Sequence, residues 1–218
     1  MSTRDDILGR IRAALGRTAQ NRGAALADVR AALSAHAAGP RPPLAADLLA
    51  RFRCESERMS STVVELASFA EVPAAVAHYL DRHALARRAL VWPRLAGLEW
   101  AAAGVEVVAR EARDGDLVGI TGCFCAIAET GTLMTCSAPD SPAATSLLPE
   151  THIAVVPLSR LVVGMEEAWA LARAEFGDRL PRAVNFISGP SRTGDIEMTI
   201  VLGAHGPYRV HILLVRDA

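Results

Sequence analysis

The sequence contains no lysine, so all 23 of its basic residues are arginine. Without a lysine amine the chain cannot form a Schiff base, anchor pyridoxal or supply the phosphate-binding lysine of a P-loop. The 24 acidic residues almost cancel the arginines and leave a formal net charge of −1. Because a nucleic-acid-binding surface needs an excess of positive charge, we expect no nucleic acid as a main partner.

The sequence also lacks a long apolar run and a paired cysteine motif. No run reaches the roughly 18 apolar residues of a membrane-spanning helix, and residues 1–15 alternate charged with apolar side chains, so we expect a cytoplasmic chain without a membrane span. The four cysteines form no C-x-x-C pair, and no histidine has a ligand partner at helical spacing. We therefore expect no metal site and no cofactor bound by this chain.

The remaining sequence divides into an N-terminal helical extension, 1–43, and an α/β domain, 44–218. Residues 2–16 carry apolar side chains at helical spacing, and the proline cluster 39–43 indicates a boundary. The apolar stripe of the first helix needs a partner, which is either the body of the protein or another subunit. A homo-oligomer is therefore one of our expectations.

From residue 60 onward, short β-branched runs alternate with helical segments, which is the rhythm of an α/β sheet. The apolar runs 117–128 and 132–136 are separated by only three residues, so we expect a tight turn between antiparallel strands and a mixed sheet with flanking helices. Residues 195–202 are ambiguous. We favour a short helix capped by Asp195, although apolar side chains alternate there as they do in a strand.

The first polar cluster is Glu129, Thr130, Gly131 and Thr132, which interrupts apolar sequence. Glu129 is the main candidate for a nucleophile or a general acid or base, since apolar surroundings raise the pKa of a carboxylic acid. The structural alternative is an acceptor for nearby hydroxyl or backbone N–H groups. Gly131 permits an unusual backbone angle or the close approach of a ligand.

The second polar cluster lies between residues 187 and 207 and concentrates hydroxyl, guanidinium, carboxylate and imidazole groups. Its candidate ligand-binding residues are Ser188, Gly189, Ser191, Arg192, Thr193 and Asp195. If Asp195 begins a helix, the preceding donors surround a helix N-terminus, which favours a carboxylate or phosphate. If the segment is instead a strand, Asp195 and Glu197 share a face as paired carboxylates. The structural alternative is turn stabilisation.

His205 follows an apolar run in the sequence Ala204-His205-Gly206-Pro207, where its imidazole is a second candidate catalytic group. We expect the two polar clusters to form opposite walls of one pocket for a small anionic ligand. The dinucleotide fingerprint G-x-G-x-x-G and the hydrolase elbow G-x-S-x-G are both absent. Their absence disfavours an ordinary Rossmann domain and an α/β-hydrolase.

At these residues the chain resembles the LUD-domain family. The matching pieces are AETGT at 128–132, LP at 148–149, HI at 152–153, VV at 155–156, ISGPSRT at 187–193, DIE at 195–197, and Gly203 with HGP at 205–207. The order and spacing of these pieces across residues 117–215 make the match specific. The resemblance of the N-terminal half is looser.

The resemblance implies a fold similar to the sugar-phosphate isomerase and CoA-transferase group. It also implies a place in a three-protein system that oxidises L-lactate to pyruvate. The two sister subunits of that system would be partners, and at least one of them would carry iron–sulfur clusters. This chain would then be a component of a lactate-oxidising complex rather than a complete enzyme.

Two other functions stay open at this point. One is a stand-alone acyl-CoA or sugar-phosphate enzyme in which Glu129 attacks a thioester or moves a proton. This alternative depends on fold analogy, which is a weak guide to function. The other is an assembly scaffold without catalytic activity, in which the polar motifs only shape the core.

Overall fold

The computed structural model describes residues 3–37, 39–41, 46–196 and 199–216, with the side chains of 195–200 left undescribed. Its internal contacts separate two units, 1–43 and 44–218. The first unit contains two helices, α1 (Thr3–Ala14) and α2 (Arg22–Ala35), and none of their described residues is buried. Apolar side chains such as Ile7, Ile11 and Leu33 are therefore exposed. None of the described helices is long and apolar enough to cross a membrane.

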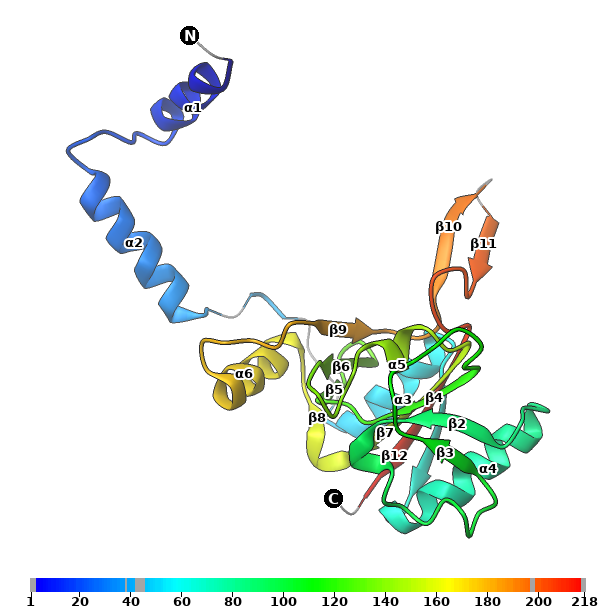
Figure 1. Ribbon diagram of the computed structural model, residues 1–218. Coiled ribbons are helices and arrows are strands. Elements are labelled where there is room, and N and C mark those ends of the chain that lie inside the picture. Colours follow the sequence, from blue (N-terminus) through cyan, green and yellow to red (C-terminus); the bar gives the residue numbers. More distant parts are fainter. Residues whose placement is uncertain (1–2, 38, 42–45, 197–198, 217–218) are drawn as a thin grey trace. The chain divides into compact units, whose positions relative to one another are not determined.

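The second unit is built on a parallel sheet of six strands (Figure 1). In spatial order the strands are β1 (Thr62–Leu66), β12 (Arg209–Val215), β7 (Thr151–Pro157), β4 (Val118–Thr121), β2 (Arg88–Val91) and β3 (Glu106–Val108). The central strands β7 and β12 are almost continuously apolar and buried, as expected for parallel strands that are covered on both faces.

A second, smaller sheet mixes parallel and antiparallel pairs. Its strands in spatial order are β8 (Leu161–Val162), β5 (Cys125–Ile127), β6 (Thr132–Cys136) and β9 (Val184–Ile187). The β5–β6 and β6–β9 pairs are antiparallel, and the β5–β8 pair is parallel. Strands β10 (Arg192–Ile196) and β11 (Thr199–Leu202) form a separate antiparallel hairpin.

The helices cover the faces of the two sheets. They are α3 (Leu48–Arg58), α4 (Val72–Arg82), the single turn α5 (Ala144–Leu147) and α6 (Met165–Phe176), with 3₁₀ turns at Phe69–Glu71, Pro93–Leu95 and Leu158–Arg160. Helix α4 packs on one face of the large sheet. Phe52 of α3 and the inner side chains of β5 and β6 pack on the other face. Helix α6 covers the outer face of the small sheet. Side chains of β5 alternate between these layers, as the pleat of a strand requires.

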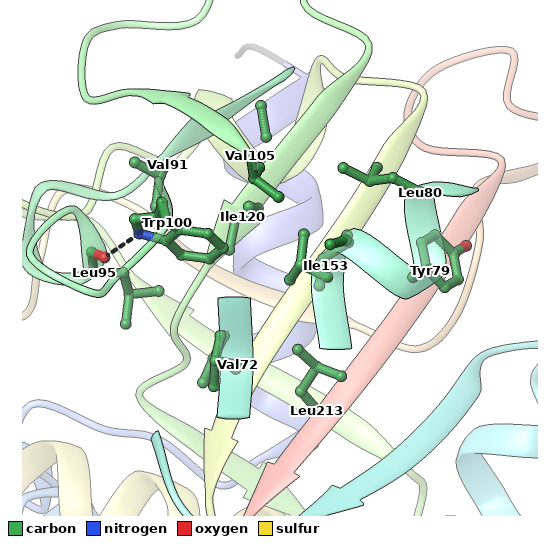
Figure 2. Close-up of a cluster of buried hydrophobic side chains, with 14 of the residues drawn as sticks. Val72, Tyr79, Leu80, Val91, Leu95, Trp100, Val105, Ile120, Ile153 and Leu213 are labelled. Carbon is green, nitrogen blue, oxygen red and sulfur yellow. Dashed lines mark hydrogen bonds between the residues drawn. The ribbon is translucent and has the colours of Figure 1, made fainter. Parts of the chain in front are cut away.

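The core between α4 and the large sheet is mainly aliphatic and includes the aromatic rings of Tyr79 and Trp100 (Figure 2). Ile120, Ile153 and Leu213 come from three neighbouring strands and meet Val72 and Leu80 of α4. Trp100 is 3% exposed, and its indole N–H donates to the backbone carbonyl of Leu95 over 2.8 Å. This bond satisfies the polar atom of an otherwise apolar ring, as burial requires.

The expected mixed α/β architecture with flanking helices is confirmed. The tight turn between antiparallel strands is also present, at residues 128–131. The apolar run 117–128, however, forms two strands in different sheets, β4 and β5, instead of one. The chain leaves the large sheet at Gly122, where no side chain separates the backbone from the Trp92 ring.

The helix favoured for residues 195–202 is wrong. The segment belongs to the β10–β11 hairpin, in which Thr193 pairs with Val201 and Ile196 pairs with Thr199. The alternation of apolar residues predicted this segment better than the possible Asp195 cap did. Alternation is the two-residue period of a strand, whereas a helix needs apolar residues three and four positions apart. Asp195 therefore caps no helix, and its side chain lies outside the described residues, as does Glu197.

Replacement of Trp100 by Phe tests the core hydrogen bond. We expect the free energy of unfolding to fall by about 1–3 kcal/mol, because the Leu95 carbonyl loses the shorter of its two hydrogen bonds, keeping only the one from the Leu98 N–H, and the smaller ring leaves space. Urea denaturation measures the change. Trp169→Phe is the matched control, since Trp169 is only partly buried and the structure gives its indole N–H no acceptor among the described residues. Equal losses in the two variants would contradict this account.

Candidate functional site

The turn between β5 and β6 approaches the last turn of α3 without an intervening side chain. Gly131 has a φ of 64°, which L side chains rarely adopt, and a Cβ there would lie 2.3 Å from the backbone nitrogen of Ser56. The Ser56 hydroxyl donates to the Gly131 carbonyl over 3.3 Å. The glycine thus permits a backbone-to-backbone contact that positions the whole 128–131 turn.

The loop after β9 makes the same kind of contact one helical turn further on. Gly189 has a φ of 83°, and a Cβ there would lie 2.2 Å from the carbonyl oxygen of Met59. Strands β6 and β9 are paired antiparallel with Leu133 opposite Ile187. The pairing and the shared contact with α3 place the two predicted polar clusters side by side.

Three hydroxyl groups meet where these two segments adjoin, and we call Thr130, Thr132 and Ser188 the hydroxyl cluster. The Oγ1 atoms of Thr130 and Thr132 lie 2.7 Å apart, and Thr132 Oγ1 lies 2.7 Å from Ser188 Oγ. Thr132 is 3% exposed, whereas Thr130 and Ser188 are exposed. The cluster therefore joins a buried hydroxyl to two that solvent or a ligand can reach.

The Glu129 carboxylate lies against the first turn of α6. A Cβ on Gly164, the residue that precedes α6, would be 2.9 Å from Glu129 Oε2 and 3.3 Å from Glu167 Oε2. The backbone of Glu129 is fixed as well, since its N–H donates to the Val163 carbonyl and its carbonyl accepts from Arg51. A carboxylate at a helix N-terminus is stabilised by the backbone N–H groups there.

Arg192 is joined to the end of α3. One guanidinium nitrogen donates to the Met59 carbonyl over 3.1 Å and to the Ser60 hydroxyl over 2.6 Å. An arginine at the C-terminus of a helix satisfies carbonyls that have no partner within the helix. These contacts fit the alternative in which the residues of the second polar cluster stabilise turns. The Arg192 side chain is nevertheless exposed and has further N–H groups that these contacts do not use.

The turn that carries His205 lies beside Ser191. The Ser191 N–H donates to the Pro207 carbonyl over 2.8 Å, and the Ser191 carbonyl accepts from Gly203 over 2.9 Å. His205 itself is exposed. The 128–131 turn and the 188–191 loop therefore contact the end of α3, and the 203–207 turn is joined to the loop through Ser191.

The candidate residues differ in how far the structure brings them together. Thr193 and Asp195 lie in β10, beyond the loop, and the helix N-terminus expected to bind an anion there does not exist. None of the four cavities that we resolve is lined by Glu129 or Arg192. The roles of the predicted site residues stay predictions, and the hydroxyl cluster is the part that the geometry supports best.

Two histidines are buried in the large sheet, away from solvent. His152 is fully buried, and its Nε2 lies 2.7 Å from Thr121 Oγ1, while its Nδ1 has no partner among the described residues. His211 stacks on the ring of Tyr79. Burial lowers the pKa of each imidazole to about 4, because the charged form loses its hydration. Both rings are therefore neutral at physiological pH.

Sequence reasoning missed a cavity of about 310 Å³ at the carboxyl ends of β2, β4 and β7, which we call the carboxyl-edge cleft. Its walls include Trp92, Arg94, Phe124 and Arg160. Each arginine follows a buried strand by three residues, in the sequences VWPR at 91–94 and PLSR at 157–160. That position was the available signal, because residues just after parallel strands gather at one edge of the sheet. No group of three metal-ligating side chains occurs among the described residues.

These features define an α/β protein with a parallel sheet, a mixed second sheet and two polar turns that contact the end of α3. The sequence model of the LUD domain matches residues 49–215. The chain therefore belongs to the LUD domain family. A solved structure of a DUF162 family protein from Deinococcus radiodurans is similar in fold, with a TM-score of 0.60 and 28% identity over 79% of this chain and 99% of that one.

Several curated relatives carry the name Lactate utilization protein C. The Bacillus licheniformis protein is 37% identical over 58% of this chain and 54% of its own length. The Bacillus subtilis protein is 40% identical over 55% and 50%, and the Exiguobacterium protein is 45% identical over 46% and 44%. The aligned part of the chain thus spans about half the length of these relatives.

Replacement of Gly131 by Ala tests the contact that positions the site. We expect a loss of at least about 2 kcal/mol in the free energy of unfolding, since the new Cβ meets backbone and not a flexible side chain, and since φ is positive. Chemical denaturation measures this loss. Gly97→Ala is the control, because nothing lies within 4 Å of its Cβ position. A Gly131→Ala protein as stable as the control would refute the contact.

The buried His152 predicts an acid-dependent loss of stability. In the unfolded chain its pKa returns to about 6.5, so the unfolded state binds a proton that the folded state refuses down to about pH 4. Stability is then complete above pH 6.5 and falls by roughly 3 kcal/mol per buried histidine between pH 6.5 and 4.

The slope of unfolding free energy against pH measures this effect. His152→Gln should reduce the slope, and His211, whose pKa is also lowered to about 4, accounts for a similar further share. His78→Gln is the control substitution, at an exposed histidine. An unaltered slope in His152→Gln would show that His152 is not neutral in the folded state.

Proposed function

We propose that this chain takes part in lactate utilization in the cytoplasm, as a subunit of an assembly that oxidises L-lactate to pyruvate. Its own contribution is to bind a small carboxylate at the hydroxyl cluster. Membership of the LUD domain family and relatives named Lactate utilization protein C support the pathway. The hydroxyl chain from Thr130 through Thr132 to Ser188 supports the ligand site.

The hydroxyl cluster is suited to a carboxylate because its buried member is held by the two outer ones. Thr132 begins β6 and Ser188 directly follows β9, so their hydroxyls have a fixed separation. Two of the three hydroxyl protons are used within the cluster, which leaves one that an exposed member, Thr130 or Ser188, can donate to a carboxylate group. Arg192 can add a charge-assisted hydrogen bond through the N–H groups that α3 does not use. This preorganisation reduces the entropy lost when a small ligand binds.

The proposed reaction also needs a proton acceptor. Oxidation of L-lactate to pyruvate removes two electrons and two protons from the carbinol group. Glu129 and His205 are the candidate bases in our proposal, since both lie in turns that adjoin the hydroxyl cluster or its loop. The electrons would pass to iron–sulfur clusters of two sister subunits, which makes this chain a component and not a complete enzyme.

Ligand-induced thermal stabilisation tests the ligand site. We expect L-lactate or pyruvate to raise the unfolding temperature, with about 2.7 kcal/mol of added stability at 100 times the dissociation constant. Thr132→Val removes the central hydroxyl and should abolish the shift. Ser68→Ala is a control hydroxyl deletion, because Ser68 makes no capping hydrogen bond and lies outside the cluster. The unfolding temperature without ligand shows whether each variant is folded.

The outcomes separate the alternatives. A shift in unfolding temperature that persists in Thr132→Val would show that the ligand binds elsewhere on the chain. Stabilisation by CoA esters or sugar phosphates, with none by lactate or pyruvate, would favour a stand-alone enzyme. A lactate-dependent dye reduction by the sister subunits that proceeds equally well without this chain would refute its place in the assembly.

A further inference from the structure

The carboxyl-edge cleft lies where the connections of the large sheet diverge. After β2 the chain continues to β3 at one edge, whereas after β4 it continues through the small sheet to β7 on the other side. Strands β2 and β4 are neighbours, with Leu90 opposite Gly119. At such a switch point the connecting loops separate and leave a crevice outside the strand ends, which is where open α/β sheets bind ligands.

The wall of the cleft is aromatic and aliphatic. Trp92 and Phe124 follow β2 and β4, Phe69 begins the 3₁₀ turn before α4, and Phe176 ends α6. Gly122 adds no side chain to this wall. A Cβ on Gly122 would lie 3.6 Å from the Trp92 ring, which is an ordinary van der Waals distance. A volume of about 310 Å³ is at the lower end of the range for small-molecule sites.

Two guanidinium groups stand on these rings. Arg94 lies 5.4 Å from the centre of the Trp92 ring, and Arg160 lies 5.6 Å from the centre of the Phe124 ring. Both distances are within the range of cation–π contacts. The cleft therefore combines flat apolar walls with two localised positive charges.

Each guanidinium is also held by one carboxylate at the rim, which leaves donors to spare. Arg94 reaches both oxygens of Asp140 through a single nitrogen at 3.0 Å. Arg160 reaches Glu175 through one nitrogen at 2.5 Å. Among the described residues no other acceptor contacts either guanidinium, and each carries five N–H donors. Arginines fixed in this way retain a fork of N–H groups for a further anion.

We propose that the carboxyl-edge cleft binds a small organic acid with a flat apolar body and one carboxylate or phosphate group. The body packs between Trp92 and Phe124, and the anionic group accepts hydrogen bonds from Arg94 and Arg160. This site is separate from the hydroxyl cluster, so the proposal for the cleft does not depend on lactate binding at the hydroxyl cluster. Neither Arg94 nor Arg160 is among the site residues predicted from the sequence.

A set of matched naphthalene compounds tests the recognition. 2-Naphthoate and 2-naphthyl phosphate carry the two anionic groups on one ring system, 2-naphthol lacks the charge, and L-lactate and inorganic phosphate lack the flat body. Calorimetry on the full chain measures each dissociation constant. We expect saturable binding of one or both naphthyl anions, and the tighter of the two identifies the preferred anionic group.

Arginine variants with a matched control locate the binding. Arg94→Gln and Arg160→Gln should each weaken the naphthyl anion by about tenfold or more, because a charge-assisted hydrogen bond is lost. Arg87→Gln is the control. Arg87 is 45% exposed and pairs with Asp81, almost as Arg94 is 46% exposed and pairs with Asp140, but it lies outside the cleft.

Cysteine protection gives a second readout that does not depend on the variants. Cys123 and Cys136 line the cleft and are 9% and 8% exposed, whereas Cys54 is exposed elsewhere. Burial raises the pKa of Cys136 to about 11, so its alkylation is slow enough to follow. Ligand at ten times its dissociation constant should slow alkylation of Cys123 and Cys136 by about tenfold and leave Cys54 unchanged.

Several results would overturn the proposal. They are equal affinity for 2-naphthol, protection of Cys136 by lactate or inorganic phosphate as strong as that by the naphthyl anions, undiminished binding in both arginine variants, or no saturable binding at all. The first two would show that the anion or the apolar body is not recognised. The last two would place the ligand outside the cleft or exclude it.

Discussion

Two glycine-containing turns rest directly on the backbone of the last turn of α3, and the position of the polar residues depends on this contact. Gly131 meets Ser56, and Gly189 meets Met59, at separations that no Cβ can occupy. The two contacts are three residues apart on the helix, so they set the two turns side by side at about 4.5 Å along the axis. The β6–β9 pairing fixes the same arrangement from the other side. Thr132 and Ser188 consequently adjoin, although 56 residues separate them.

The two candidate ligand sites, the hydroxyl cluster and the carboxyl-edge cleft, lie at different places around the large sheet. The hydroxyl cluster depends on α3 and the small sheet, whereas the carboxyl-edge cleft depends on the ends of β2, β4 and β7. The small sheet connects them, because β5 directly follows the cleft residue Phe124 and leads into the turn that contains Glu129.

Much of this fold follows from local sequence. The alternation of β-branched runs with helical segments from residue 60 and the three-residue gap between the apolar runs 117–128 and 132–136 are both visible in the sequence, and the α/β fold and the turn at 128–131 form as expected. The helix favoured at 195–202 was wrong because helix and strand periodicity are nearly indistinguishable over eight residues. The division of 117–128 between two sheets was also missed, since a buried strand in either sheet has the same apolar composition.

The sequence by itself determined the class of fold, the positions of the polar clusters and the exclusion of lysine chemistry, because these depend on residue type and local periodicity. Only the tertiary structure decided which polar groups meet. In the folded chain Thr132 contacts Ser188, and Arg192 bonds to the end of α3. The Glu129 carboxylate lies at the start of α6, and Arg94 and Arg160 lie over aromatic rings in one cleft. These contacts join residues that are far apart in sequence, so they depend on strand order and on the close approach of backbones, which no local pattern encodes.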